Sequence, residues 1–215
     1  MPVLGSVDGI HRPVRSLIGT GFGFVLLAVA ALALAGCGDD RSATREESVQ
    51  SIRGALETDH DPAKAVALAV SAVRDDADSS VLQYWLGRSY QARGRQGDAL
   101  KAFERAAEIG NEELRDAIQF GIAKSCALRF IETRDREDLN RCEGDLRGFA
   151  SGGAHAASAS ILLGIALSEP TPRRDPKRAL ELLEQGFRLE AQPSEIDDVA
   201  RARTRLEELR KELGH

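Results

Sequence analysis

The feature that most constrains the fold is a set of small and apolar positions that recurs after 34 residues. The matched pairs are Ala65 and Ala99, Ala69 and Phe103, Ala72 and Ala106, Val73 and Ala107, Ile52 and Leu86, and Leu56 and Tyr90. A fixed period of this size is typical of chains built from stacked supersecondary units. Because no run alternates polar and apolar residues with period two, the units are expected to be helical. The sequence therefore predicts an all-α chain of helix hairpins.

The second unit carries a motif of small and bulky residues. It comprises Leu86-Gly87, Tyr90, Gly94, Ala99, Phe103 and Ala106. Two antiparallel helices approach closely where Gly87 and Ala99 are small, Phe103 fills the seam, and Gly94 favours the end of the first helix. The spacing resembles the consensus of the tetratricopeptide repeat family, although Trp85 does not occupy that family's usual tryptophan position. This resemblance implies a right-handed solenoid.

We expect about four repeats followed by a capping helix. The first two repeats span 46–79 and 80–113, and the third, at 114–152, is degenerate because its second helix (136–149) arrives late. The fourth begins near Ala156, and its long connector (169–175) resembles that of the related Sel-like repeat. A last helix, from Ser194 to about Leu213, presents a polar face that can close the stack.

The N-terminus has the pattern of a secretory signal. A segment containing Arg12 and Arg15 precedes the apolar stretch 17–35, which ends in Leu-Ala-Gly-Cys at residues 34–37. This tetrapeptide resembles the bacterial lipobox, in which the cysteine is acylated and becomes the first mature residue. The alternative is a transmembrane anchor, because about 20 apolar residues span a bilayer. We therefore predict a signal peptide at 1–36, lipid on Cys37, a polar tether at 37–45 and a repeat domain at 46–213.

Two cysteines remain once Cys37 carries lipid. In an oxidising compartment an even pair, Cys126 and Cys142, favours a disulfide. That bridge closes a loop of roughly 15 residues and adds about 3 kcal/mol to stability if it is unstrained. The alternative is two buried free thiols.

Charge and motifs exclude several functional classes. Removal of residues 1–36 leaves 27 basic and 33 acidic residues of the original 29 and 34, a net charge of −6. A nucleic-acid partner is not expected without a basic face. His60 lies between two aspartates in a predicted turn, and His155 lies in a segment without spaced metal ligands. With no catalytic triad or phosphate-binding loop, we expect no enzymatic activity, metal, cofactor or small-molecule substrate.

Function is therefore expected to depend on a surface. In the tetratricopeptide family the first helix of each hairpin lines a concave groove that binds peptides or helices. That resemblance assigns to the groove Tyr84, Arg88, Gln91, Ile118, Ile122, Ile161 and Ile165. An apolar floor with one arginine and one tyrosine suits a partner's hydrophobic segment. The alternative is that the isoleucines pack against neighbouring repeats.

These features predict a lipid-anchored scaffold or adaptor of the bacterial envelope that binds another protein or peptide. It would lie outside the cytoplasm, on the periplasmic side of the outer or inner membrane or at the cell surface. Two alternatives are a permanent structural subunit of a secretion, pilus or outer-membrane assembly machine, and, less favoured, a cell-wall enzyme. The first predicts a large exposed apolar patch. The second predicts a deep pocket with paired carboxylates.

Overall fold

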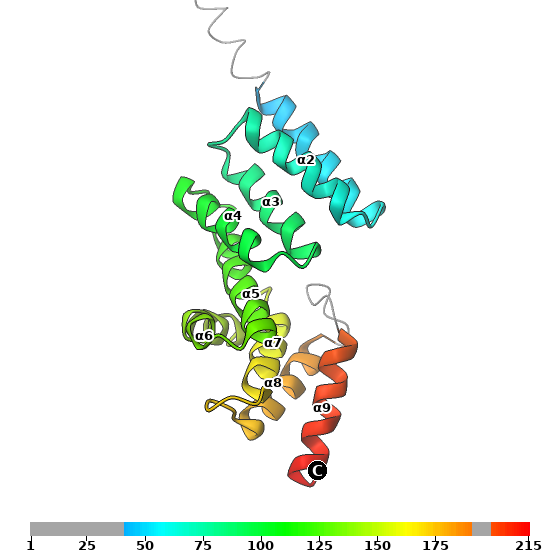
Figure 1. Cartoon of the computed structure of the whole chain (residues 1–215), viewed down its shortest axis with the longest axis vertical. Coiled ribbons are helices and arrows are strands. Elements are labelled where there is room, and N and C mark those ends of the chain that lie inside the picture. The colour runs from blue at the N-terminus through cyan, green and yellow to red at the C-terminus, as the bar shows by residue number, and fades with distance from the viewer. Residues whose placement is uncertain (1–40, 191–198) are drawn as a thin grey trace, which may run out of the picture. The chain divides into compact units, whose positions relative to one another are not determined.

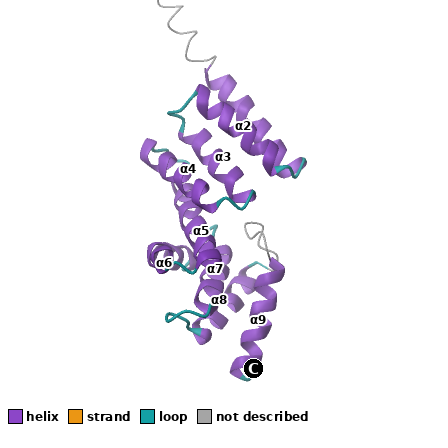
Figure 2. Ribbon diagram, in the orientation of Figure 1, coloured by secondary structure: helices purple, strands orange, loops and turns teal. Residues whose placement is uncertain are grey.

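The computed structural model describes residues 41–190 and 199–215, and these residues are helical between short turns, with no strand among them (Figures 1 and 2). The chain divides into two compact units, Met1–Ala43 and Thr44–His215, and the helices labelled in Figure 1 belong to the second. In that unit a helix up to residue 53 continues into a π-helical turn. The elements that follow are η1 (Gly54–Thr58), α2 (Pro62–Asp75), α3 (Ser80–Ala92), α4 (Gln96–Ile109), α5 (Arg115–Thr133), α6 (Arg136–Ala150), α7 (Ala156–Ser168), α8 (Pro176–Leu189) and α9 (Val199–Leu213).

Each helix from α2 to α8 packs against the next one along the chain. In addition, α3 contacts α5, α5 contacts α7, and α7 contacts α9. This arrangement is that of a solenoid of helix hairpins, so the predicted all-α fold class is confirmed, whereas its right-handedness stays a prediction. The second helix of the third repeat, predicted at 136–149, is α6, and the predicted connector 169–175 separates α7 from α8. Residues 41–45, predicted as tether, are helical. The predicted start of the capping helix, at Ser194, lies outside the described residues.

Local signals in the sequence fix where the helices begin and end. The side chains of Asp61, Ser79 and Asp175 accept hydrogen bonds from backbone N–H groups in the first turns of α2, α3 and α8. Gly94 follows α3 with a φ of +74°, a left-handed conformation that glycine adopts without strain. The predicted role of Gly94 at the end of this helix is therefore confirmed.

The seams between helices depend on glycines that leave room for one large side chain. Phe103 of α4 is fully buried. A Cβ atom on Gly87 would lie 2.8 Å from its ring, and one on Gly121 of α5 would lie 2.7 Å away. Gly121 is the 34-residue counterpart of Gly87, so the repeat places a glycine on both sides of the same ring. This explains how α3, α4 and α5 approach one another closely.

The hydrophobic core forms two clusters. One contains residues between Val49 and Ala102, including Trp85 and Leu86 of α3. The other contains residues between Leu100 and Leu209 and surrounds α7, all 13 residues of which are buried. In α9, Ala202, Leu206 and Leu209 are buried against this second cluster, and Leu213 packs partly against it. The last helix therefore covers the end of the stack, as predicted for a cap.

Candidate partner-binding groove

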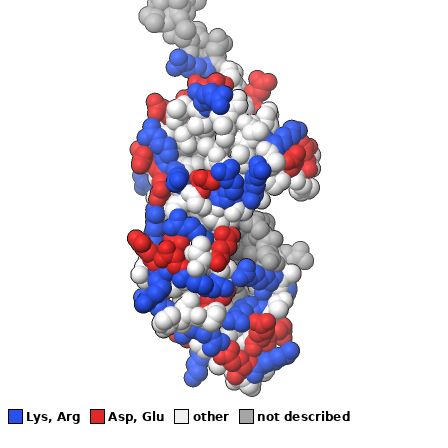
Figure 3. All heavy atoms as spheres, in the orientation of Figure 1, with Lys and Arg blue, Asp and Glu red and all other residues white. Residues whose placement is uncertain are grey.

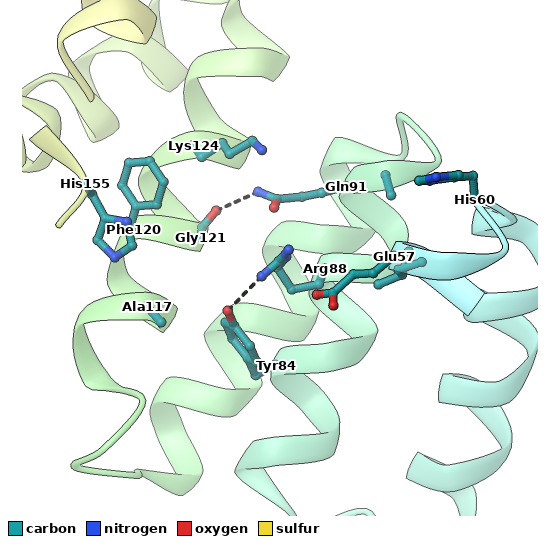
Figure 4. A pocket seen from close by; sticks show the side chains of 12 residues that line it. Glu57, His60, Tyr84, Arg88, Gln91, Ala117, Phe120, Gly121, Lys124 and His155 are labelled. Atoms are coloured by element: carbon teal, nitrogen blue, oxygen red, sulfur yellow. Dashed lines mark hydrogen bonds between the residues drawn. The ribbon is translucent and has the colours of Figure 1, made fainter. Parts of the chain in front are cut away.

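A cleft of about 340 Å³ lies between α3 and α5. Tyr84, Arg88 and Gln91 occupy successive turns of α3 and line one wall, because residues three or four apart share a helix face. Phe120 and Lys124 of α5 line the opposite wall, as Figure 4 shows. The structure thus brings together the three residues of α3 that the sequence assigned to a groove.

Tyr84 and Arg88 form a supported pair at the mouth of this cleft. Arg88 Nη1 donates a hydrogen bond to Tyr84 Oη over 3.2 Å (Figure 4). The guanidinium carbon of Arg88 lies 5.6 Å from the ring centroid of Trp85, within the range of a cation–π contact. The Tyr84 ring packs against those of Trp85 and Phe103, at centroid distances of 5.7 and 5.8 Å. Both side chains are half-buried, so they are positioned by the core yet reach solvent.

Gln91 has a different role from the one predicted. It is 5% exposed, and its Nε2 donates to the Gly121 carbonyl oxygen over 3.1 Å and to Ser125 Oγ over 2.8 Å. These bonds join α3 to α5 in the interior. Gln91 therefore holds the two walls of the cleft together rather than projecting toward a partner.

The α5 wall contains residues that sequence reasoning missed. His155 stacks on Phe120 with ring centroids 4.2 Å apart and an angle of 5° between the rings, and Phe149 meets Phe120 edge to face at 5.4 Å. Lys124 is 8% exposed and lies beside this aromatic group (Figure 4). The 34-residue period gave no signal for them, because it places Phe120 and Lys124 at the positions of Leu86 and Tyr90, neither of which lines the cleft.

The isoleucines do not form an apolar floor. Ile118 and Ile161 are 2% and 0% exposed and belong to the interior, so their assignment to a partner-binding surface is wrong. Ile165, 5% exposed, touches a separate cleft at α9. Ile122 is half-buried and packs against the second core cluster. For Ile161 and Ile165 the physical reason is that α7 packs against α5, α6, α8 and α9, and every residue of this helix is buried.

Cys126 and Cys142 are both buried in the second core cluster, on α5 and α6. The structure contains them as free thiols, in place of the disulfide that the cysteine count favoured. Burial raises the pKa of Cys142 to about 12 and also raises the pKa of Cys126. Because the thiolate is the reactive form, both thiols are poor nucleophiles in the folded protein.

The remaining predictions concern the lipid anchor, a membrane span and metal binding. Cys37 lies outside the described residues. No helix in the described ranges has the length and apolar character that a bilayer span requires. Within the same residues, no three histidine, cysteine or acidic side chains are grouped closely enough to hold a metal ion. His60 lines the rim of the cleft in a left-handed turn with a φ of +52°.

No protein-family model matches the chain, and no curated protein matches it either. Function is therefore inferred from the geometry of the groove itself.

Proposed function

We propose that this protein is a lipid-anchored scaffold or adaptor of the bacterial envelope, and that it binds an extended segment of another protein in the groove between α3 and α5. The observation that carries the proposal is the Tyr84–Arg88 pair. Two side chains of the types enriched at binding hot spots are fixed by the core and half-open to solvent. Little conformational freedom would be lost when a partner binds them.

The lining of the groove favours a partner segment with both polar and aromatic or aliphatic character. Arg88 supplies positive charge and hydrogen-bond donors, the exposed Glu57 supplies one negative charge, and the half-buried Leu56 supplies apolar surface. A peptide that carries an apolar side chain next to an acceptor group matches these walls. This differs from the wholly hydrophobic segment that the isoleucines suggested.

The surface composition favours reversible binding over permanent assembly. Among the described residues, Leu189 is the large hydrophobic side chain that is exposed, at 58%. Basic and acidic side chains are interspersed over the face shown in Figure 3. Obligate interfaces are large and apolar, whereas this surface carries few exposed hydrophobic side chains and many charged ones. A permanent subunit of an assembly machine is therefore the second candidate, and a cell-wall enzyme the third.

The repeat pattern supports a binding role, and the lipobox supports attachment to a membrane. The match of Leu86-Gly87, Tyr90 and Phe103 to the tetratricopeptide consensus supports a binding module, and helix-hairpin solenoids act mainly through their surfaces. Lipid on Cys37 would hold this module at a membrane. Several acyl chains give stable attachment without a basic patch, since each buried methylene contributes about 0.8 kcal/mol.

The groove is tested with the intact lipoprotein carrying Tyr84→Ala and Arg88→Ala together. Partners captured from envelope extract are quantified against the unaltered protein, and the affinity of each purified partner is then measured. We expect at least about a tenfold loss of affinity, the usual effect of removing hot-spot residues. Arg105→Ala is the matched control, because Arg105 on α4 pairs with Glu108 and with Asp78 of the α2–α3 turn, and it does not line the cleft. Unchanged capture by the double variant would show that the groove is not the binding surface.

The anchor is tested separately with Cys37→Ser. We expect this variant to lose the acyl chains and to leave the membrane fraction, as measured by mass spectrometry and fractionation. The lipoprotein proposal is wrong if Cys37→Ser stays in the membrane fraction and its mature form differs in mass from the unaltered protein only by the substitution.

A further inference from the structure

A second cleft, of about 640 Å³, lies between α7, the connector that follows it, and α9. Four arginines line it: Arg134 at the end of α5, Arg174 in the connector, and Arg201 and Arg205 on α9. Glu169 and Glu208 are the acidic residues of the lining. The lining therefore has a net charge of +2, in a chain whose total charge is −5.

The arginines face the opening, whereas the central acid lies beneath them. The arginine side chains are 25–50% exposed, and that of Glu169 is 10% exposed. Arg134 Nη2 lies 2.6 Å and Arg201 Nη2 lies 3.5 Å from the Glu169 carboxylate oxygens. Two guanidinium groups from different helices thus already converge on one carboxylate.

The other two arginines are held in place by the end of α7. Arg174 Nε donates to the Ser168 carbonyl oxygen over 3.3 Å, and Arg205 Nε donates to Ser168 Oγ over 2.8 Å. Arg205 also pairs with Glu208 at 2.7 Å, and Arg174 pairs with Glu212. Fixed guanidinium groups lose little freedom when they bind a ligand, so the cleft is preorganised for an anion.

We propose that this arginine cleft binds the carboxylates of an acidic peptide segment. Guanidinium groups are well suited to bind carboxylates, and Glu169 shows that Arg134 and Arg201 reach one carboxylate together, each through its Nη2 atom. The lining charge of +2 matches one or two carboxylates rather than a densely charged polyanion. The site is separate from the α3–α5 groove, so it does not depend on the function proposed for Tyr84 and Arg88.

The test uses the purified full chain in detergent and a short fluorescent peptide that alternates glutamate and serine, with a glutamine–serine peptide as its neutral counterpart. Fluorescence anisotropy should show salt-sensitive binding of the acidic peptide and none of the neutral one. Arg134→Gln with Arg201→Gln should weaken binding by about tenfold or more. Arg203→Gln is the matched control on α9, because Arg203 lies 4.7 Å from the Phe187 ring and does not line the cleft. It should bind as the unaltered protein does.

A second variant separates binding from folding. Glu169→Gln removes the resident carboxylate that competes for Arg134 and Arg201, so the acidic peptide should bind several-fold more tightly. Loss of structure cannot produce this gain. Weaker or unchanged binding by Glu169→Gln, equal binding of the two peptides, or an equal loss in Arg203→Gln would each overturn the proposal. Tighter binding of inorganic phosphate than of the acidic peptide would overturn it as well.

Discussion

Helices α3 and α7 are both first helices of their hairpins, yet they differ in how much of their surface is exposed to solvent. Along α3, Tyr84 and Arg88 stay half-open and form a wall of the groove. Along α7, every residue from Ala156 to Ser168 is buried. The difference lies in the neighbours, because α7 is enclosed by α5, α6, α8 and α9. Equivalent positions in a repeat therefore take different roles where the stack is closed, and a groove extends only as far as its helices remain uncovered.

The largest expected effect is on the free energy of unfolding, and it is tested with two isoleucines that were both predicted to line the groove. Ile161→Ala removes a fully buried side chain from α7 and should destabilise the fold by about 2–5 kcal/mol. Ile122→Ala on α5 removes a half-buried side chain and should cost clearly less, about 1 kcal/mol. Urea unfolding followed by circular dichroism measures both. Equal losses of stability would contradict the greater enclosure of α7.

Repeat-level features were predictable because the hairpin motif contains them. The motif of the second repeat predicted that Gly87 and Phe103 lie at the seam between two helices, and the Phe103 ring lies against both Gly87 and Gly121. The end of α3 near Gly94 and the connector 169–175 were predictable because glycine and proline favour turns. These signals are local, so one sequence suffices to detect them.

The candidate site was predictable only on the α3 side. Tyr84 and Arg88 were predicted from the resemblance to the tetratricopeptide repeat, but Gln91 forms buried hydrogen bonds to Gly121 and Ser125 that no local pattern predicts. His155 joins the groove because the turn before α7 carries it onto Phe120. The burial of Ile161 depends on which helices cover α7. These are tertiary contacts between distant segments, and the period specifies the hairpin rather than what covers it.

The second prediction concerns the closest helix approach around α7. A Cβ atom on Gly186 would lie 2.5 Å from Ile161 Cγ1 and 2.9 Å from the Ala157 carbonyl oxygen. Because the backbone of α7 cannot move away within its enclosure, Gly186→Ala should destabilise the protein by about 1–3 kcal/mol.

Gly144→Ala is the control for that substitution, since no atom lies within 4 Å of the added Cβ on the exposed face of α6. It should stabilise the protein by about 0.5–1 kcal/mol through the higher helix propensity of alanine. Thermal unfolding of the two variants should therefore shift in opposite directions. Shifts of the same sign would contradict the close packing of α8 on α7.

The most gradual expected effect concerns the titration of the Cys142 thiol, which lies in the core cluster around α7. The described residues of the core cluster around α3 include no thiol. The pKa of Cys142 is about 12 in the folded protein, compared with 9.0 for an unperturbed thiol. Between these values the unfolded chain releases the proton and the folded protein retains it. The free energy of unfolding must then decrease as pH rises, by at most about 1.4 kcal/mol per pH unit for one proton.

Cys142→Ala should therefore show a shallower loss of stability from pH 9 upward than the unaltered protein, whatever its stability at neutral pH. Unfolding by urea at a series of pH values, with a reducing agent present, measures the two slopes. Lysine and tyrosine titrate in both proteins, so their contribution cancels in the difference. Parallel slopes would mean that the Cys142 thiol reaches solvent in the folded state. The enclosure that distinguishes the α7 region from the open α3 wall would then not extend to the neighbouring helix α6.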